Sequence, residues 1–160
     1  MRNFLGTASS VTSTEKWLQA LAAGQTFSHS VNVLAVAAQN SHAQLRNPVG
    51  SGVTALVRIY YMSAGAASNV SLTFDNVALG TDNGFGINML SGGAASKCKV
   101  FSTTNAGILG TTVEQFQVNA STPFIPFIEW LCQLAPGQGV DLALAVVNVS
   151  LLVTWKWMEQ

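Results

Sequence analysis

The side chains in this 160-residue chain that could do chemistry are few: two histidines, two cysteines and seven acidic residues. A nucleophilic triad needs a base, and the only histidines, His29 and His42, each lie beside serines in probable strand or strand-edge sequence. However, no Gly-x-Ser-x-Gly segment is present to expose a nucleophilic serine at a strand-to-helix turn. We therefore interpret both histidines as structural or surface residues, and the sequence predicts no catalytic residue.

Metal and phosphate sites are equally unsupported by spacing. Cys98 and Cys132 are separated from each other and from the histidines by more than the short intervals of zinc sites. Asp82-Asn83-Gly84 resembles the start of a calcium loop but lacks its third ligand and its distal glutamate, so we expect a turn. The glycines at Gly84-Phe85-Gly86 and Gly92-Gly93 precede no helix signal and form no phosphate cradle. The sequence predicts no metal and no cofactor.

Charged and aromatic residues give no stronger signal. Glu114 and Glu129 lie on separate predicted strands and are a conceivable carboxylate pair, although seven acids in the chain make such a pair uninformative. Lys97 and Lys99 are the only close basic pair, which is too little for nucleic-acid binding. Aromatic side chains in alternating strands are more often in a core or a subunit interface than stacked on bases or sugars. They are Tyr60, Tyr61, Trp155 and Trp157.

The chain is unusually poor in charge. Only 9% of its residues are charged, against roughly 25% in a typical soluble domain, and seven basic and seven acidic residues leave no net charge. A neutral, charge-poor surface protects weakly against self-association. We favour a subunit that is packed against other subunits over a small domain coated with Ser, Thr and Asn. We expect a homo-oligomer, either a dimer or a trimer.

The hydrophobic stretches do not have the length of a membrane span. No window holds about 18 uninterrupted apolar residues, and Val140–Val153 is interrupted by Asp141, Asn148 and Ser150. The first residues contain no apolar core of signal-peptide length. We therefore expect a protein that is made and kept in a cytoplasm or released from one by lysis, with free thiols at both cysteines.

The N-terminal residues are predicted to form an arm and one helix. Residues 1–12 are small and polar and indicate an arm. A short helix is predicted over 15–23, where Ser13 or Thr14 caps its start and Gly24 stops it. At this length the helix is marginal alone, so it must dock on its own sheet or on a neighbour. Its apolar face is predicted to comprise Trp17, Leu18 and Leu21.

From Phe27 onward the chain alternates in the manner of short strands separated by Gly, Asn and Ser turns. Eight or so such strands with almost no helix predict an all-β fold, an antiparallel β-sandwich or barrel, in a single domain over 25–160 that follows the arm and helix of 1–24. A glycine-rich loop is expected over 77–96, with a short strand near 85–89. The strands are predicted at 31–36, 53–62, 69–75, 97–102, 113–118, 124–133, 140–146 and 151–157.

The last two strands carry the widest apolar face. Val140, Leu142, Leu144 and Val146 alternate on one strand, and the second strand has the same pattern in the opposite parity. A hairpin around Asn148-Val149 would align these faces and set Asp141 opposite Lys156. Alternatively, the two strands cross between two sheets and face each other across the core. Both arrangements bury the same apolar residues. The second strand contributes Leu151, Val153, Trp155 and Trp157.

Three segments resemble recurring segments of tailed-bacteriophage virion proteins. They are Gln44-Leu45-Arg46-Asn47-Pro48-Val49-Gly50-Ser51-Gly52 with the strand that follows, Leu21-Ala22-Ala23-Gly24, and the C-terminal pattern of Leu134-Ala135-Pro136-Gly137-Gln138-Gly139, Asn148 and Trp155-Lys156-Trp157-Met158-Glu159. The resemblance covers roughly 21–62 and 123–159. These are signatures of turns and strands, without catalytic motifs. The resemblance implies a jelly-roll-like virion protein, most similar to a capsid decoration (cement) protein.

The resemblance also bears on the last two strands. In viral jelly rolls these strands lie in opposite sheets, and Val149 is β-branched and disfavours the positive φ of a two-residue hairpin. We therefore favour the crossing. Leu142, Leu144, Val153 and Trp155 should be buried, whereas Asp141 and Lys156 should be exposed or at an interface.

The expected function is non-enzymatic: a decoration subunit on the virion capsid surface, assembled in the host cytoplasm, that binds the major capsid protein and copies of itself. No nucleic-acid or membrane partner is expected. The alternatives are a small β-domain of a head fibre, tail or baseplate, and a carbohydrate-binding adsorption module that holds a glycan on exposed Tyr or Trp. The residues expected at the interface are Phe4, Trp17, Leu18, Leu21, Tyr60 and Lys156.

Overall fold

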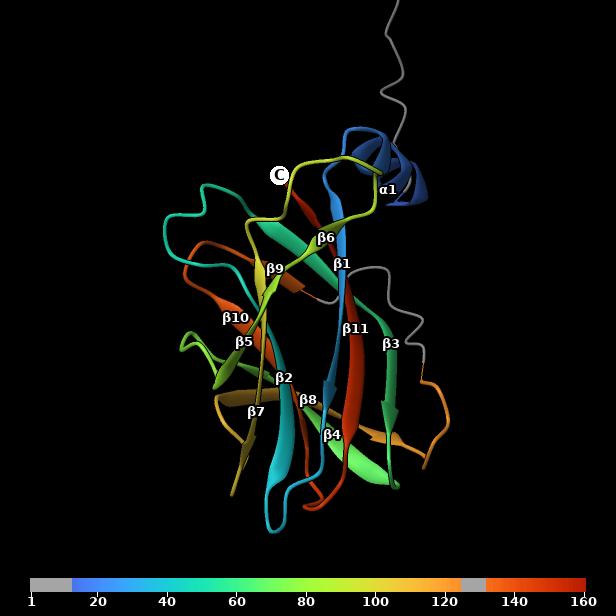
Figure 1. Ribbon diagram of the computed structural model, residues 1–160, viewed down its shortest axis with the longest axis vertical. Helices are drawn as coiled ribbons and strands as arrows, with labels where there is room; N and C mark the ends of the chain where they lie inside the picture. The colour runs from blue at the N-terminus through green and yellow to red at the C-terminus, as the bar shows by residue number, and fades with distance from the viewer. Residues whose placement is uncertain (1–12, 125–131) are drawn as a thin grey trace, which may run out of the picture.

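A computed structural model describes residues 13–124 and 132–160, with the side chains of Ser13, Thr14 and Tyr60 left aside, as two antiparallel sheets packed face to face (Figure 1). Sheet A has the strand order β6-β1-β11-β3-β9, and sheet B has the order β5-β7-β2-β10-β4-β8. The elements are α1 (Ser13–Ala22), β1 (Thr26–Val33), β2 (Asn40–Arg46), β3 (Ala55–Ala64), β4 (Ser68–Phe74), β5 (Thr81–Phe85), β6 (Ile87–Asn88), β7 (Lys99–Asn105), β8 (Thr111–Val118), β9 (Cys132–Leu134), β10 (Gly139–Leu144) and β11 (Leu151–Glu159).

The order of the strands is that of a jelly roll. The chain changes sheet at every step from β1 to β4 and again from β8 to β11, so it wraps around the core twice. Strands β5, β6 and β7 form an insertion between β4 and β8 that extends both sheets. The predicted all-β antiparallel sandwich is confirmed, and within the described residues α1 is the only helix.

The crossing of the last two strands is also confirmed. β10 pairs with β2 and β4 in sheet B, whereas β11 pairs with β1 and β3 in sheet A. The turn between them has its positive φ, 61°, at Asn148, which tolerates it better than the β-branched Val149 would. The hairpin alternative, with Asp141 opposite Lys156, is therefore wrong.

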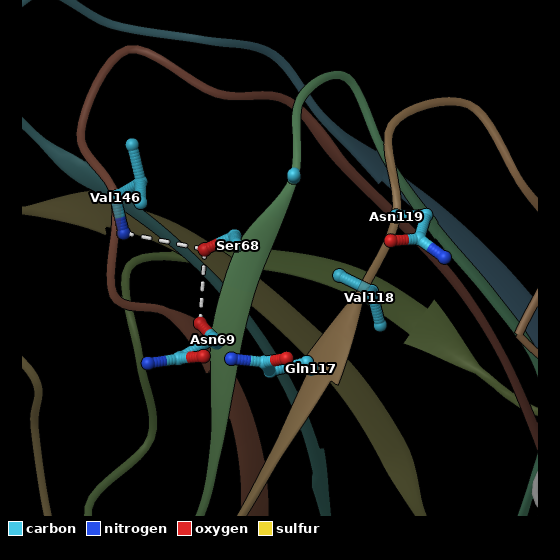
Figure 2. A pocket seen from close by; sticks show the side chains of 7 residues that line it. Ser68, Asn69, Gln117, Val118, Asn119 and Val146 are labelled. Carbon is cyan, nitrogen blue, oxygen red and sulfur yellow. Dashed lines mark hydrogen bonds between the residues drawn. The ribbon is translucent and has the colours of Figure 1, made fainter.

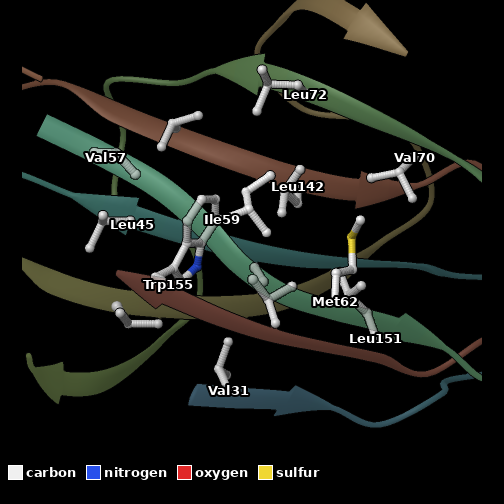
Figure 3. Close-up of a cluster of buried hydrophobic side chains, with 14 of the residues drawn as sticks. Val31, Leu45, Val57, Ile59, Met62, Val70, Leu72, Leu142, Leu151 and Trp155 are labelled. Carbon is white, nitrogen blue, oxygen red and sulfur yellow. The ribbon is translucent and has the colours of Figure 1, made fainter. Parts of the chain in front are cut away.

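The core lies between the sheets and is apolar (Figure 3). Leu142, Leu144, Val153 and Trp155 are all fully buried, as the alternation predicts. Burial of large aliphatic and aromatic side chains contributes roughly 1.5–3 kcal/mol each, so this layer is the main source of stability.

Several predicted details of the strands are wrong. The sequence predicts no strand where β2 lies, and β10 ends at Leu144, so Val146, which the alternation assigns to the buried face, is exposed in the connection that follows. The first strand ends at Val33 and begins at Thr26, so 34–36 belong to a connection. In β3 the register against β11 shifts beside Tyr60, where Tyr61 pairs with Thr154 and Ile59 with Trp155. The extra residue reverses the alternation, so Met62 enters the core, whereas Tyr61, which strict alternation from Ile59 would place there, is only half-buried.

Helix α1 ends as predicted, at a left-handed glycine. Gly24 has φ of 67°, its amide donates to the Leu21 carbonyl, and the Gln25 amide donates to the Ala20 carbonyl, which is the Schellman arrangement. Figure 1 shows α1 beside the C terminus, at the opposite end of the sandwich from the connections that follow β1 and β10. Across residues 13–124 and 132–160, no helix combines the length and apolarity needed to span a membrane.

Candidate functional site

The helix predicted to reach a neighbour lies on its own sheet. The guanidinium carbon of Arg58, on β3, lies 5.7 Å from the centre of the Trp17 ring, and Arg58 pairs in register with Lys156 of β11. Burial, and next the charge of Arg58, lower the pKa of Lys156 below its usual range. The sequence left open whether α1 docks on its own sheet or on a neighbouring molecule, and the structure shows it on its own sheet.

The exposed part of the helix differs from the predicted apolar face. Ala20 is buried, Trp17 and Leu21 are half-buried, and Leu18 is 56% exposed. Leu18 is thus the member of the predicted apolar face that is exposed to another molecule. Among the other expected interface residues, Lys156 is half-buried, Phe4 lies outside the described residues, and the side chain of Tyr60 does too.

A second surface lies at the far end of the sandwich. We call it the loop end and define it as residues 34–39, 65–67, 119–124 and 145–150, the described parts of the four connections that meet there. These segments contain no Asp, Glu, Lys or Arg. The large aliphatic side chains exposed on it are Leu34, Val36, Val146 and Val147.

The loop end is tied together by hydrogen bonds between its connections. The Ala38 amide donates to Asn148 Oδ1 over 2.6 Å, and the Asn148 amide donates to the Gln39 carbonyl. The Gly65 amide donates to the Ser150 carbonyl. Backbone strain collects in the same place, because all the non-glycine residues with positive φ among the described ones lie here: Ala38, Ser121 and Asn148. The aliphatic side chains are therefore presented on a fixed backbone.

A pocket of about 310 Å³ opens where the loop end meets the edge of sheet B (Figure 2). Ser68 Oγ accepts a hydrogen bond from the Val146 amide at its rim. The carboxamides of Asn69, Gln117 and Asn119 also line it, and within the described residues they make no side-chain hydrogen bond. The pocket thus offers neutral donors and acceptors and no charge.

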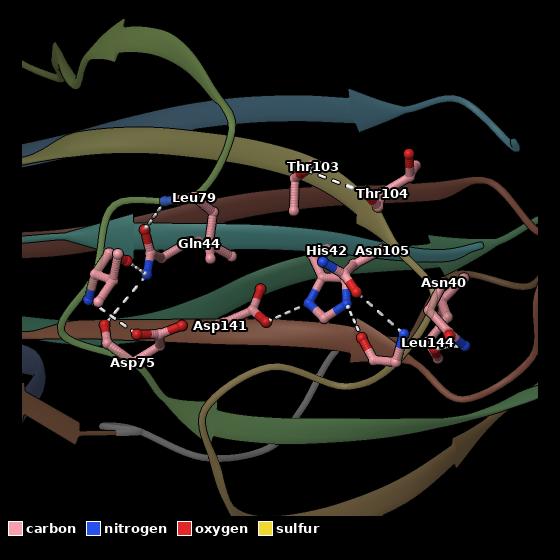
Figure 4. A network of polar contacts seen from close by, with 12 residues as sticks. Asn40, His42, Gln44, Asp75, Leu79, Thr103, Thr104, Asn105, Asp141 and Leu144 are labelled. Carbon is pink, nitrogen blue, oxygen red and sulfur yellow. Dashed lines mark hydrogen bonds and ion pairs between the residues drawn. The ribbon is translucent and has the colours of Figure 1, made fainter.

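The most unusual polar cluster is buried on the outer face of sheet B (Figure 4). His42 Nδ1 lies 2.7 Å from Asp141 Oδ2, and both side chains are fully buried. The Gly107 carbonyl, in the β7–β8 connection over 106–110, accepts a hydrogen bond from His42 Nε2 at 3.1 Å. Burial raises the pKa of Asp141 above its usual range, and the nearby Asp75 adds to this, while His42 opposes it.

The expectation that Asp141 is exposed or at an interface is therefore wrong. Two connections cross the outer face of sheet B and cover the part of it that holds His42, Gln44 and Asp141. One is 106–110, and the other is 75–80. The Gln44 side chain holds the second connection: Gln44 Nε2 donates to the Asp75 and Val77 carbonyls, and Gln44 Oε1 accepts from the Leu79 amide. We call the covered residues the outer polar layer: His42, Gln44, Ser71, Thr73 and Asp141, all fully buried.

The histidine–aspartate pair is not arranged for acid–base catalysis. Both ring nitrogens of His42 are occupied by partners within the chain, and neither reaches a surface. His29 is half-buried at a hollow of about 400 Å³ beside β6, where its Nδ1 lies 3.1 Å from the Phe85 carbonyl oxygen. The interpretation of His42 as a structural residue fits this geometry.

The other residues considered for chemistry have structural partners. The Gly84 amide donates to Asp82 Oδ1 within β5, where the register against β7 shifts between Asp82 and Phe85. The segment is therefore an irregularity within a strand, and the predicted turn is wrong. Lys99 Nζ lies 2.7 Å from Asp82 Oδ2 and lowers the pKa of that carboxyl. Burial raises the pKa of the Cys132 thiol to about 12. Burial, and then Glu159, raise the pKa of the Cys98 thiol. Neither cysteine forms a disulfide.

The described residues hold no cluster of three or more His, Cys, Asp or Glu that could bind a metal ion. Of the conceivable carboxylate pair, Glu114 is exposed on β8 and Glu129 lies outside the described residues. Glu159 instead forms a buried anchor: it accepts hydrogen bonds from Trp157 Nε1, from Ser96 Oγ and from the amides of Lys97 and Cys98. This acid belongs to the C-terminal pattern on which the resemblance rests.

Sequence reasoning missed the loop end and the pocket. The signal for the loop end was present, because none of its segments contains a charge, but only the fold brings them together. Comparison of the chain with protein-family models, with curated proteins and with solved structures finds no match.

Proposed function

We propose that this protein is a non-enzymatic virion subunit that decorates the capsid surface and binds the major capsid protein. The observation that carries the proposal is the loop end, a charge-free surface with exposed Leu34, Val36, Val146 and Val147. Contiguous exposed apolar residues on a soluble domain mark sites of protein–protein contact. The resemblance of the C-terminal and Gln44–Tyr61 segments to phage virion proteins supplies the identity of the partner.

The rigidity of the loop end supports a binding role. Binding costs conformational entropy wherever loops must be ordered, and preorganised loops reduce that cost. The hydrogen bonds from the Ala38 amide to Asn148 and from the Gly65 amide to Ser150 fix three of these connections before a partner arrives. Repetition of the contact over many capsid sites would add avidity without any new contact.

The burial of the chemically capable groups favours binding over catalysis. His42 and Asp141 are enclosed, and Cys98 is buried beside Glu159. The fully buried Trp155 and Trp157 present no ring to a sugar, which leaves the glycan-binding alternative without its aromatic platform among these residues.

The N-terminal arm is the second proposed contact. Leu18 is exposed on α1, and residues 1–12 precede that helix. Because Ala20 is buried and Trp17 stacks on Arg58, a truncation through residue 23 would remove packing from sheet A as well as the arm. A truncation of residues 1–12 keeps α1 and is the cleaner test: it should leave the domain folded and weaken attachment to the capsid.

The proposal is tested by co-sedimentation with shells assembled from the major capsid protein of the same virus. Wild-type protein should bind saturably. The double variant Leu34→Asp/Val146→Asp places two charges on the loop end and should weaken binding at least tenfold, because charges are poorly tolerated in the core of an interface. Val49→Asp adds a charge at an 81% exposed site on the opposite end of the sandwich and should bind as the wild type does.

Two outcomes would contradict the proposal. Absence of saturable binding by wild-type protein would remove the capsid function. Equal binding by the wild type and the loop-end variant would place the contact elsewhere. All the substituted side chains are exposed, so the variants should fold as the wild type does. Circular dichroism of each variant checks that the fold is retained.

A further inference from the structure

The strand β8 is the longest sheet edge that the structure describes. It spans eight residues, whereas the strands at the other three edges, β5, β6 and β9, are described over five, two and three residues. Among the described residues β8 pairs with β4 alone. An edge strand presents a row of backbone donors and acceptors that can pair with another chain.

The usual protections of an edge strand are nearly absent from β8. It contains no Pro, Lys or Arg, and Glu114 is its one charged residue. A register shift leaves Val113 without a partner in β4 and interrupts the strand at that point. Beyond the shift, Glu114–Val118 pairs without interruption with Ser68–Leu72, so five residues form a regular edge.

We propose that two copies of this protein associate through antiparallel pairing of β8 with β8, which joins their two B sheets into one. The regular run fixes the register. A two-fold axis at Phe116 sets Glu114 opposite Val118 of the second copy and Gln115 opposite Gln117 of the second copy. An axis at Glu114 would instead set two carboxylates directly opposite each other, which is destabilising.

The glutamine side chains of this register complement each other. Gln115 Nε2 donates to Ser71 Oγ over 3.1 Å, which leaves its carbonyl oxygen as an acceptor. Gln117 makes no side-chain hydrogen bond within the described residues, so its amide is available as a donor. Antiparallel pairing brings that donor to that acceptor twice, once on each side of the axis. Both glutamines lie on the outer face of sheet B, because their partners in β4 are Ser71 and Asn69.

The inner face of the edge is suited to the same contact. Phe116 is half-buried and stacks on Phe124, with ring centres 5.2 Å apart. At the two-fold axis it would meet Phe116 of the second copy. In this register the two Glu114 carboxylates are four residues apart along the paired strands, roughly 13 Å, which is beyond the screening length of about 8 Å at physiological salt.

Such a contact is small. Stable complexes commonly bury about 800 Å² on each partner, and a single strand edge buries less. We therefore expect a dimer that forms and dissociates with protein concentration. This inference selects the dimer from the dimer or trimer that the composition led us to expect. It does not depend on capsid binding, because it is measured on the isolated protein.

The test introduces charges of opposite sign in two separate variants and measures their association by sedimentation equilibrium. The variant Gln115→Lys/Gln117→Lys places like charges directly opposite each other in the paired strands, and Gln115→Glu/Gln117→Glu does the same with the opposite sign. Each variant alone should be monomeric at concentrations where the wild type is dimeric. An equimolar mixture should form a heterodimer, since every contact then pairs a lysine with a glutamate.

A matched control adds the same charge elsewhere. Ser30→Lys/Asn32→Lys alters two exposed positions of β1 in sheet A and should dimerise as the wild type does. The proposal is overturned if the wild type stays monomeric up to its solubility limit, if either charged variant dimerises as well as the wild type, or if the mixture remains monomeric. Near-ultraviolet circular dichroism of both charged variants confirms that they are folded.

Discussion

The core between the sheets and the outer polar layer are buried to the same extent and held together differently. Trp155, Leu142 and Val153 in the core and His42, Gln44 and Asp141 in the outer polar layer are all fully buried. The core is stabilised by apolar area, which has no preferred direction. The outer polar layer depends on directional bonds, such as the 2.7 Å contact of His42 with Asp141. Burial alone therefore does not say what a substitution will cost.

The two layers also differ in how they are covered. Each sheet covers the inner face of the other, a consequence of the sandwich itself. The outer polar layer is covered by the connections 75–80 and 106–110, which lead into and out of the insertion β5–β7. Substitutions in the two layers should therefore differ in their cost and in its dependence on pH.

The largest effect is expected in the core. Trp155→Ala should lower the free energy of unfolding by about 3–5 kcal/mol, the range for truncation of a large buried aromatic residue. Urea denaturation measures it. Trp155→Phe is the control and should cost less, because it retains an aromatic ring and removes an indole nitrogen that is buried without a hydrogen-bond partner. A loss below about 1 kcal/mol for Trp155→Ala would show that the core repacks around the cavity.

The second effect is expected in the outer polar layer. Asp141→Ala leaves His42 Nδ1 buried without its partner and should cost about 2–3 kcal/mol, within the range for an unsatisfied buried polar group. Asp141→Asn should cost roughly 1 kcal/mol or less, because its amide can donate to Nδ1 while Nε2 still donates to the Gly107 carbonyl. Equal losses for the two variants in urea denaturation would mean that the bond contributes nothing and that packing alone decides.

The third effect distinguishes the layers by pH. The pKa of Asp141 is raised above 3.8, so the stability that its protonated form contributes is fully present below that pH and is lost as the pH rises through the folded-state value. The wild type should therefore lose stability relative to Asp141→Asn from about pH 4 upward. The difference between wild type and Trp155→Phe should stay constant over the same range. A constant difference for Asp141→Asn would contradict the ionisation argument.

The smallest effect is expected on the outer face of sheet A, which α1 covers only in part. Lys156→Ala should change the free energy of unfolding by no more than about 1 kcal/mol, because Lys156 is half-buried beside the like charge of Arg58. A double-mutant cycle with Asp141 should give no coupling, since the two residues lie in different sheets. A loss above about 2 kcal/mol would place Lys156 among the buried pairs.

The sequence predicts the core well because a single physical rule governs it. Apolar residues at every second position must face one side of a strand, so Leu142, Leu144, Val153 and Trp155 could be assigned without knowing their neighbours. The same rule gave the wrong result for Asp141, since alternation assigns a polar residue to solvent. Asp141 is buried against His42, which lies 99 residues away in the chain, and no local sequence pattern reports such a contact.

The candidate site was less accessible to prediction for a related reason. The residues of the helix, Trp17, Leu18 and Leu21, were identified from their period, although the exposed one could be told only from the docking of α1 on sheet A. The loop end is assembled from four separate connections. Its distinguishing property is an absence of charge, which becomes visible only when the four segments are placed side by side.

The position of β10 and β11 determines when the protein can fold during synthesis. β11 lies between β1 and β3, and β10 lies between β2 and β4, so each occupies an interior position of its sheet. Both are translated after the other strands that the structure describes. Until they leave the ribosome, β1 and β3 cannot join into one sheet, and neither can β2 and β4. A nascent chain halted before residue 139 should therefore remain open to protease, however long it waits.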